Sequence, residues 1–278
     1  MAKESFSLTV HSIKVLIKRE LVSSLQGWGF YGAIFVSLIV CSFLLKNFMG
    51  GIREENILIS SYPLNFPLFV SVIIISFYLV VISAISISRE REQGTLEILF
   101  YGPVSSFSFT VGKYFKDIFL YLITLIFFAA YFFGVSALTN LGFTYSLVKS
   151  LGLSIFWVSC VISFGLFISS LTGRVRSSII WLVAILLAFL AIQFAHSAFL
   201  SFPKEALSTP LLYLRRTLYY LSKGISWVSP FSYISRGMES IQIESMKLYL
   251  LNIGYCIVYS VIFLTLSVYI LKLKGVRG

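Results

Sequence analysis

The stretch from Ile179 to Ala195 reads IIWLVAILLAFLAIQFA, and apolar side chains occupy its odd and even positions alike. A strand that spans a membrane alternates apolar and polar residues over about 10 positions, so this pattern does not fit a transmembrane barrel. Within lipid, every backbone N–H and C=O group has to be paired inside the protein, and a helix is the remaining way to achieve this. The stretch therefore predicts a membrane-spanning helix.

The whole chain has the same apolar character. It has 278 residues, of which 58% are hydrophobic and only 12% are charged, and its mean hydropathy is +0.92. A soluble domain has about 25% charged residues, so this chain has too few polar side chains to cover a water-facing surface. We expect an all-α membrane protein that forms a single domain over residues 1–278.

Six apolar windows between charged residues are longer than the about 20 residues that a spanning helix needs. They are Glu20–Lys46, Glu55–Arg89, Asp117–Lys149, Ser150–Gly173, Ser177–Pro203 and Lys247–Lys272. Charged residues mark the boundaries because a charge at the centre of a spanning helix costs roughly 2.5–3.5 kcal/mol. The sequence thus predicts six transmembrane helices. In the fourth window, Gly165 and Ser169 form a small-xxx-small pair, which is typical of close helix packing.

The net charge of +11 is distributed around these windows. Most Lys and Arg residues flank the windows, which is typical of topological signals and argues against nucleic-acid binding. Basic residues precede the first window, lie between the second and third, form the Arg174–Arg176 turn and follow the sixth. This pattern places both termini in the cytoplasm. The segment 203–247 is also basic although it falls outside, but charge in long loops constrains orientation less.

Candidate catalytic groups are sparse. Three cysteines lie within apolar windows without a C-x-x-C pair, and no His or Cys has metal-ligand spacing: Cys41, Cys160 and Cys256. The one dense acidic group, Glu90, Glu92 and Glu97, alternates with arginines, which favours ion pairing over catalysis. We therefore expect no cofactor or metal bound by this chain, with a membrane-embedded enzyme as a minor alternative. Because the sequence has no P-loop, any ATP hydrolysis requires a separate chain.

Two segments outside the windows have amphipathic patterns. From Ser12 to Leu25, apolar residues recur at helical spacing while Lys14, Lys18 and Arg19 lie off that stripe. This predicts a helix over about 12–26 in the cytoplasmic interface, or else an extension of the first spanning helix. The second segment, from Leu211 to Val228, predicts one or two short amphipathic or re-entrant helices, broken at Pro230, within a long external loop of about 203–247.

The most charged stretch lies between the second and third windows, where residues 88–103 read SREREQGTLEILFYGP. Gly94 weakens a helix by about 1 kcal/mol relative to Ala, and Thr95 is suited to cap a new one. The new helix would have Leu96, Leu99 and Phe100 on one side and Glu97 on another. A short helix held in a cytoplasmic loop is suited to docking into a partner's groove, whereas most charged runs are simply solvated turns.

Several of these residues match one family pattern. The run Glu90–Glu97 (ERE-Q-GTLE), followed by Pro103 and by Gly112-Lys113, resembles the E-R-E-x-G-T-L-E … P … G-K pattern of ABC-2 type permeases, the membrane subunits of certain ATP-binding-cassette transporters. Two weaker features agree with this resemblance. Lys18–Leu21 (KREL) is similar to the K-K/R-E-L of the family's connecting helix, and Ser229–Phe231 (SPF) with Arg236-Gly237 is similar to an element before the last helix of several members.

The resemblance implies a fold and a set of partners. It implies a dimer of this chain, or of this chain and a paralogue, resting on two ATPase subunits that bind ATP and Mg²⁺, in the cell (inner) membrane of a bacterium or archaeon. It implies a coupling element formed by Glu90, Arg91, Glu92, Gly94, Thr95, Leu96 and Glu97, within a coupling loop of about 89–103. It also implies a connecting helix that carries Lys14, Lys18, Arg19 and Glu20.

The expected function is that of the permease subunit of an exporter for a hydrophobic or amphiphilic substrate. The windows contain almost no ionisable residues, which argues against an ion-coupled carrier. An alternative keeps the ATPase but transports nothing: the chain would instead transmit ATP-driven movement to an extracytoplasmic partner through the segment 203–247.

Overall fold

The computed structural model describes residues 2–55, 64–101, 104–139, 144–201 and 209–274. These residues form ten helices and contain no strand. The helices are α1 (Ala2–Leu25), α2 (Trp28–Glu55), α3 (Asn65–Glu92), α4 (Thr95–Tyr101), α5 (Ser106–Thr139), α6 (Tyr145–Leu171), α7 (Val175–Ser201), α8 (Thr209–Val228), α9 (Ser232–Gln242) and α10 (Met246–Lys274). The all-α prediction is confirmed.

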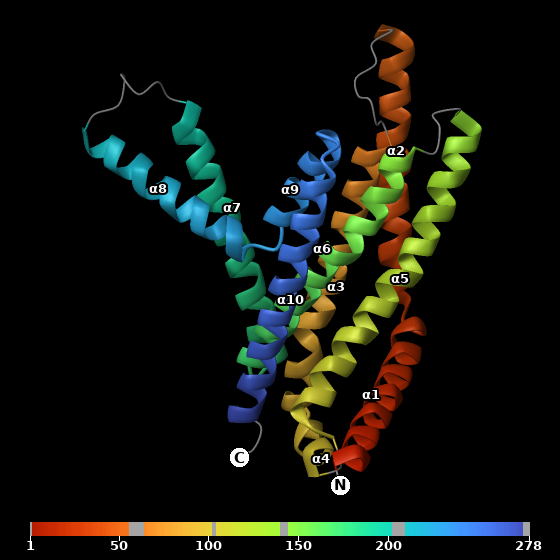
Figure 1. Cartoon of the computed structure of the whole chain (residues 1–278), viewed down its shortest axis with the longest axis vertical. Coiled ribbons are helices and arrows are strands. Elements are labelled where there is room, and N and C mark those ends of the chain that lie inside the picture. The colour runs from red at the N-terminus through yellow and green to blue at the C-terminus, as the bar shows by residue number, and fades with distance from the viewer. Residues whose placement is uncertain (1, 56–63, 102–103, 140–143, 202–208, 275–278) are drawn as a thin grey trace.

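Six of these helices are long and apolar enough to cross a membrane: α2, α3, α5, α6, α7 and α10. Each corresponds to one apolar window, so the predicted number of spans is confirmed. The start of α1, the end of α10 and the short helix α4 lie together at one end of the bundle (Figure 1), which we call the lower end after its position in that figure. The end of α7 and the start of α8 lie at the opposite, upper end.

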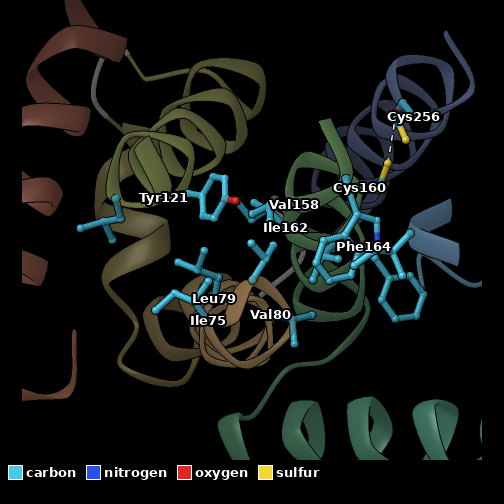
Figure 2. Packing of buried hydrophobic residues seen from close by; sticks show 14 of the residues in the cluster. Ile75, Leu79, Val80, Tyr121, Val158, Cys160, Ile162, Phe164 and Cys256 are labelled. Carbon is cyan, nitrogen blue, oxygen red and sulfur yellow. Dashed lines mark hydrogen bonds between the residues drawn. The ribbon is translucent and has the colours of Figure 1, made fainter. Parts of the chain in front are cut away.

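The centre of the bundle is the pair α3 and α6. Within the apolar windows of these two helices, 56% and 78% of the residues are buried, against 11% for α7. Figure 2 shows Ile75, Leu79 and Val80 of α3 facing Val158 and Ile162 of α6. The helix α7 leans away from the bundle towards its upper end, with α8 beside it (Figure 1). The apolar side of α7 is therefore left to lipid or to another protein chain.

The small-xxx-small pair of α6 explains how closely the two central helices approach. A Cβ added at Gly165 would lie 2.8 Å from the Cβ of Ser83 and 2.9 Å from the carbonyl oxygen of Val80, so only glycine fits. One turn on, the Ser169 hydroxyl accepts hydrogen bonds of 3.0 Å from the backbone N–H groups of both Ile87 and Ser88. The predicted packing role of this pair is confirmed.

The helices α8 and α9 form a re-entrant pair that dips into the upper half of the bundle. They meet in the turn at Pro230, whose carbonyl accepts a 2.8 Å hydrogen bond from the indole Nε1 of Trp157, near the middle of α6. Phe231, the next residue, stacks on Phe77 near the middle of α3. The turn is therefore deep, as Figure 1 also shows. The predicted break at Pro230 is confirmed, whereas residues 202–208 of the predicted loop lie outside the described residues.

Two boundaries differ from the prediction. The helix α1 begins at Ala2 instead of residue 12, and a break at Gln26-Gly27 separates it from α2, so it is not a continuous extension of the first spanning helix. The helix α5 begins at Ser106, so Lys113, Lys116 and Asp117 lie inside a helix and are buried instead of marking its border. Charges could enter this helix because each has a partner of opposite sign.

Candidate functional site

The lower end contains a buried ionic cluster that joins three helices. The Nζ atom of Lys113, on α5, lies 2.9 Å from Oε1 of Glu20 on α1 and 2.7 Å from Oε1 of Glu90 on α3. Lys113 is only 4% exposed. We call these three residues the Lys113 cluster. Because one ammonium group holds two carboxylates, the cluster fixes α1 and the end of α3 to α5.

The electrostatics of the cluster favour a charged Glu20. Burial alone would raise the pKa of the Glu20 carboxyl, but the charge and hydrogen bond of Lys113 and the charge of Lys116 together hold that pKa below its ordinary value of 4.5. A second pair lies beside the cluster, where Lys116 contacts Asp117 at 2.7 Å and Ser83 donates a 2.7 Å hydrogen bond to the same carboxylate. The buried cations are thus paired.

Arg91 and Glu92, which follow Glu90 on α3, contact the turn between α6 and α7. A guanidinium nitrogen of Arg91 donates hydrogen bonds to the carbonyl oxygens of Ser170, at 3.4 Å, and Thr172, at 3.0 Å, at the end of α6. The carboxylate of Glu92 accepts a 2.9 Å hydrogen bond from the backbone N–H of Val175, the first residue of α7. Both contacts are favourable because cations suit helix C-termini and anions suit helix N-termini.

The corner between α3 and α4 depends on Gly94. Its φ of +69° lies in the left-handed region, where glycine is favoured and where helices commonly end. The hydroxyl of Thr95 donates a 3.1 Å hydrogen bond to the carbonyl of Glu90. The Thr95 side chain therefore provides a hydrogen bond to a carbonyl in the last turn of α3. The sequence predicted instead that Thr95 caps the start of α4. The corner connects α3 to α4.

The short helix α4 has the two faces that the sequence predicts. Leu96 is buried, and Leu99 and Phe100 pack against the core. Glu97 is exposed on the other side. Two large side chains that the sequence analysis did not single out accompany it, Ile98 at 72% exposure and Tyr101 at 92%. The outer face of α4 is therefore a partly apolar surface at the tip of the lower end, and Gly102 and Pro103 lie outside the described residues.

The predicted connecting helix corresponds to α1, which runs beside the lower part of α5 (Figure 1). Leu16 is buried against Gly112, where a Cβ would lie 3.4 Å from that of Leu16. Lys14, Lys18 and Arg19 are exposed, whereas Glu20 points inward to Lys113. Sequence reasoning grouped Glu20 with the three cations. In the structure its carboxylate binds Lys113 and also lies 3.5 Å from a guanidinium nitrogen of Arg19.

The residues that the sequence predicts as a coupling element therefore divide into two sets. Glu90, Arg91 and Glu92 point into the chain, to α5, the end of α6 and the start of α7. Gly94 and Thr95 form the corner, Leu96 anchors α4, and Glu97 faces outward. The alternation of acids and arginines did predict ion pairing for Glu90, but the partners of Arg91 and Glu92 are about 80 residues away in sequence and carry no local signal.

The Ser229–Phe231 element and Arg236-Gly237 hold the re-entrant pair in place. Arg236 lies over the ring of Trp227, with 4.7 Å between its guanidinium carbon and the ring centroid, and donates to the carbonyl of Ser226. A Cβ at Gly237 would lie 2.3 Å from a methyl carbon of Leu153 on α6. These residues thus allow α9 to pack closely against α6, α8 and α10.

Among the described residues, no three His, Cys, Asp or Glu side chains come together as a metal-binding group. The acidic residues near the coupling corner also separate: Glu90 binds Lys113, Glu92 caps α7 and Glu97 is exposed. What the site offers is a set of mechanical links and an exposed helix face.

Comparison with known proteins agrees with this description. No curated protein matches the chain. The model of the family described as "ABC-2 family transporter protein" matches residues 53–269, from the end of α2 to the last turns of α10. This match covers most of the chain and includes α4, the Lys113 position and the re-entrant pair. The chain belongs to the ABC-2 transporter family and is a membrane subunit of an ATP-binding-cassette transporter.

Proposed function

We propose that this chain exports a hydrophobic or amphiphilic substrate, driven by a separate ATPase subunit that docks on the outer face of α4. The observation that carries the proposal is the arrangement of the coupling corner. One face of α4 is anchored by Leu96, while Glu97, Ile98 and Tyr101 are presented outward. Exposed aromatic and apolar side chains on a short helix are typical anchors for a partner's groove.

The three residues before the corner connect this docking face to the bundle. Glu90 is held by α5, Arg91 by the end of α6 and Glu92 by the start of α7. A displacement of α4 by a partner is therefore carried into three spanning helices at once, through contacts that have defined geometry. This supports a role in transmitting ATP-driven movement, with the lower end on the cytoplasmic side.

The remaining surfaces support the other parts of the proposal. The apolar side of α7 is exposed over its length, with Ile180, Trp181 and Phe194 as large examples, and offers a surface for a second permease copy or a paralogue. The buried ionisable residues of α5, Lys113, Lys116 and Asp117, are paired with one another or with Glu20 and Glu90. Their pairing disfavours an ion path and favours an apolar or amphiphilic substrate.

The experiment is affinity purification of the tagged full chain from its native host in mild detergent, with mass spectrometry of the proteins that co-purify. We expect a near-stoichiometric protein with a P-loop. The variant Ile98→Asp should reduce its recovery about tenfold, since burying an unpaired charge in an apolar contact is costly. Ile243→Asp is the matched control, because Ile243 is also exposed but lies between α9 and α10.

Each outcome assigns the function differently. Recovery of the ATPase with both variants would remove α4 as the docking site while leaving the family membership intact. Recovery of the chain alone, in repeated preparations, would overturn the ATP-driven proposal. ATPase activity that no amphiphile stimulates, together with a co-purifying extracytoplasmic protein, would favour transmission of movement without cargo.

A further inference from the structure

A cleft of about 700 Å³ lies at the lower end between α1, α3 and α5. It is separate from the outer face of α4, and the Lys113 cluster forms part of its wall. Its walls contain four cationic side chains and two carboxylates, so the lining has an excess of two positive charges. The cations are Arg19, Arg89, Lys113 and Lys116, and the carboxylates are Glu20 and Glu90.

The lining changes from charged to apolar along α3. Arg89 and Glu90 lie near the lower end, whereas Ile85, Ile82 and Tyr78 follow deeper in the bundle. Roughly three turns of helix separate Arg89 from Tyr78, about 16 Å at about 1.5 Å per residue. One leaflet of hydrocarbon is about 15 Å thick, half of the about 30 Å core. The cleft therefore has the polarity and length of a lipid headgroup joined to the upper part of its acyl chains.

The charges inside the cleft are not evenly compensated. Lys113 is shared by Glu20 and Glu90, and Arg19 lies 3.5 Å from the same carboxylate oxygen of Glu20 while remaining 58% exposed. The second oxygen of Glu90, Oε2, is buried and accepts no hydrogen bond from the described residues. At the rim, by contrast, Arg19 and Arg89 are exposed guanidinium groups. A ligand that fits both features has an anion near the rim and a hydrogen-bond donor that reaches Glu90.

We propose that this cleft binds the phosphate-bearing headgroup of a membrane amphiphile whose headgroup also carries an ammonium or hydroxyl donor. Arg19 and Arg89 hold the phosphate, because guanidinium groups bind phosphate oxygens in pairs of charge-assisted hydrogen bonds. The donor binds Oε2 of Glu90, and the acyl chains lie along Ile82, Ile85 and Tyr78. Basic pockets between membrane helices are a recurring form of headgroup site.

The proposal does not depend on ATPase docking, because binding is measured on this chain alone. The experiment is native mass spectrometry of the purified full chain with added lipids that have identical acyl chains. Phosphatidylethanolamine has an ammonium donor, whereas phosphatidylcholine has the same phosphate and no N–H. We expect the first to bind at least about fivefold more tightly, and soluble glycerophosphoethanolamine not to compete at equal concentration, since it lacks the acyl chains.

Variants locate the binding in the cleft. The double variant Arg19→Gln with Arg89→Gln should weaken phosphatidylethanolamine binding about tenfold. The matched control is Arg174→Gln with Arg176→Gln, which removes the same charge from exposed residues in the α6–α7 turn and the first turn of α7, at the same end. Ser86→Trp, which fills the cleft without changing its charge, should remove binding of both lipids. Size-exclusion profiles and thermal unfolding verify that each variant is folded.

Three results would overturn the inference. Equal weakening by the two double variants would show that the lipids respond only to overall charge. Equal affinity for the two lipids would remove the role of Glu90. Full competition by glycerophosphoethanolamine would assign the site to a soluble phosphoester instead of a membrane lipid.

Discussion

At the scale of single residues, Lys113 shows where reasoning from sequence reaches its limit. Lys113, Lys116 and Asp117, three charged residues within five positions, predict a helix border, since a charge inside a spanning helix is expensive. In the structure α5 continues through them, because Glu20, Glu90 and Ser83 supply partners from α1 and α3. No pattern within α5 reveals these partners, so the sequence placed the helix start about ten residues too late.

Replacing Lys113 tests whether the cluster holds α1 in place. In Lys113→Met the two carboxylates of Glu20 and Glu90 remain partly buried without their shared cation. Removing one partner of a buried pair costs about 3–5 kcal/mol, and partial exposure should keep the loss near the lower limit. We expect Lys113→Met to unfold at a clearly lower concentration of sodium dodecyl sulfate than the original chain, measured by titration with this detergent.

Lys18→Met is the matched control. Lys18 is an exposed lysine on α1, the helix that the cluster attaches, and its replacement removes the same charge. Its effect should stay within about 0.5 kcal/mol, as for most surface substitutions. Adding Glu90→Gln to Lys113→Met should recover part of the stability, since one buried charge is removed. Equal stability of Lys113→Met and Lys18→Met would show that the cluster contributes nothing to the attachment of α1.

At the scale of helices, the sequence predicts single elements better than their contacts. The two faces of α4 follow from the spacing of Leu96, Leu99 and Phe100, and the structure has both. The break between α8 and α9 follows from Pro230, which lacks a backbone N–H. The depth of that turn does not follow, because it is determined by Trp157 on α6, a residue that is distant in sequence.

The contact between Trp157 and the Pro230 turn gives the prediction at this scale. Trp157→Phe keeps an aromatic ring in the core but removes the indole N–H that binds the Pro230 carbonyl. The carbonyl then keeps only the longer, 3.4 Å hydrogen bond from the backbone N–H of Tyr233, and the loss of one such hydrogen bond costs about 0.5–1.5 kcal/mol. We expect a lower unfolding temperature and faster protease cleavage in α8 and α9, measured by intrinsic fluorescence and by mass spectrometry of fragments.

Trp181→Phe on α7 is the control, because Trp181 is exposed and this change should leave both measurements unaltered. If Trp157→Phe changed the unfolding temperature but left cleavage in α8 and α9 at the level of the original chain, the hydrogen bond would stabilise α6 without holding the re-entrant pair.

At the scale of the whole molecule, hydropathy predicts how many helices cross the membrane but not which ones are central. All six windows are strongly apolar, yet 78% of the residues in the α6 window are buried, against 11% in the α7 window. The difference depends on close-packing residues such as Gly165 and on Ser169, which bring α6 against α3. In lipid, apolar side chains are equally compatible with protein and with acyl chains, so composition alone does not distinguish a core helix from a peripheral one.

The charge pattern predicts which end of this bundle faces the cytoplasm, and introduced cysteines can test it. Cys41, Cys160 and Cys256 are all buried, so an exposed new thiol should dominate labelling. Arg174→Cys reports the lower end and Tyr145→Cys the upper end, since both positions are exposed. In intact cells, a membrane-impermeant maleimide should label Tyr145→Cys, and it should label Arg174→Cys only after the membrane is permeabilised, because short basic loops are retained in the cytoplasm. The original chain is the control for background labelling. The reverse pattern would place α4 and the Lys113 cluster outside the cell, where no ATP-driven partner could reach them.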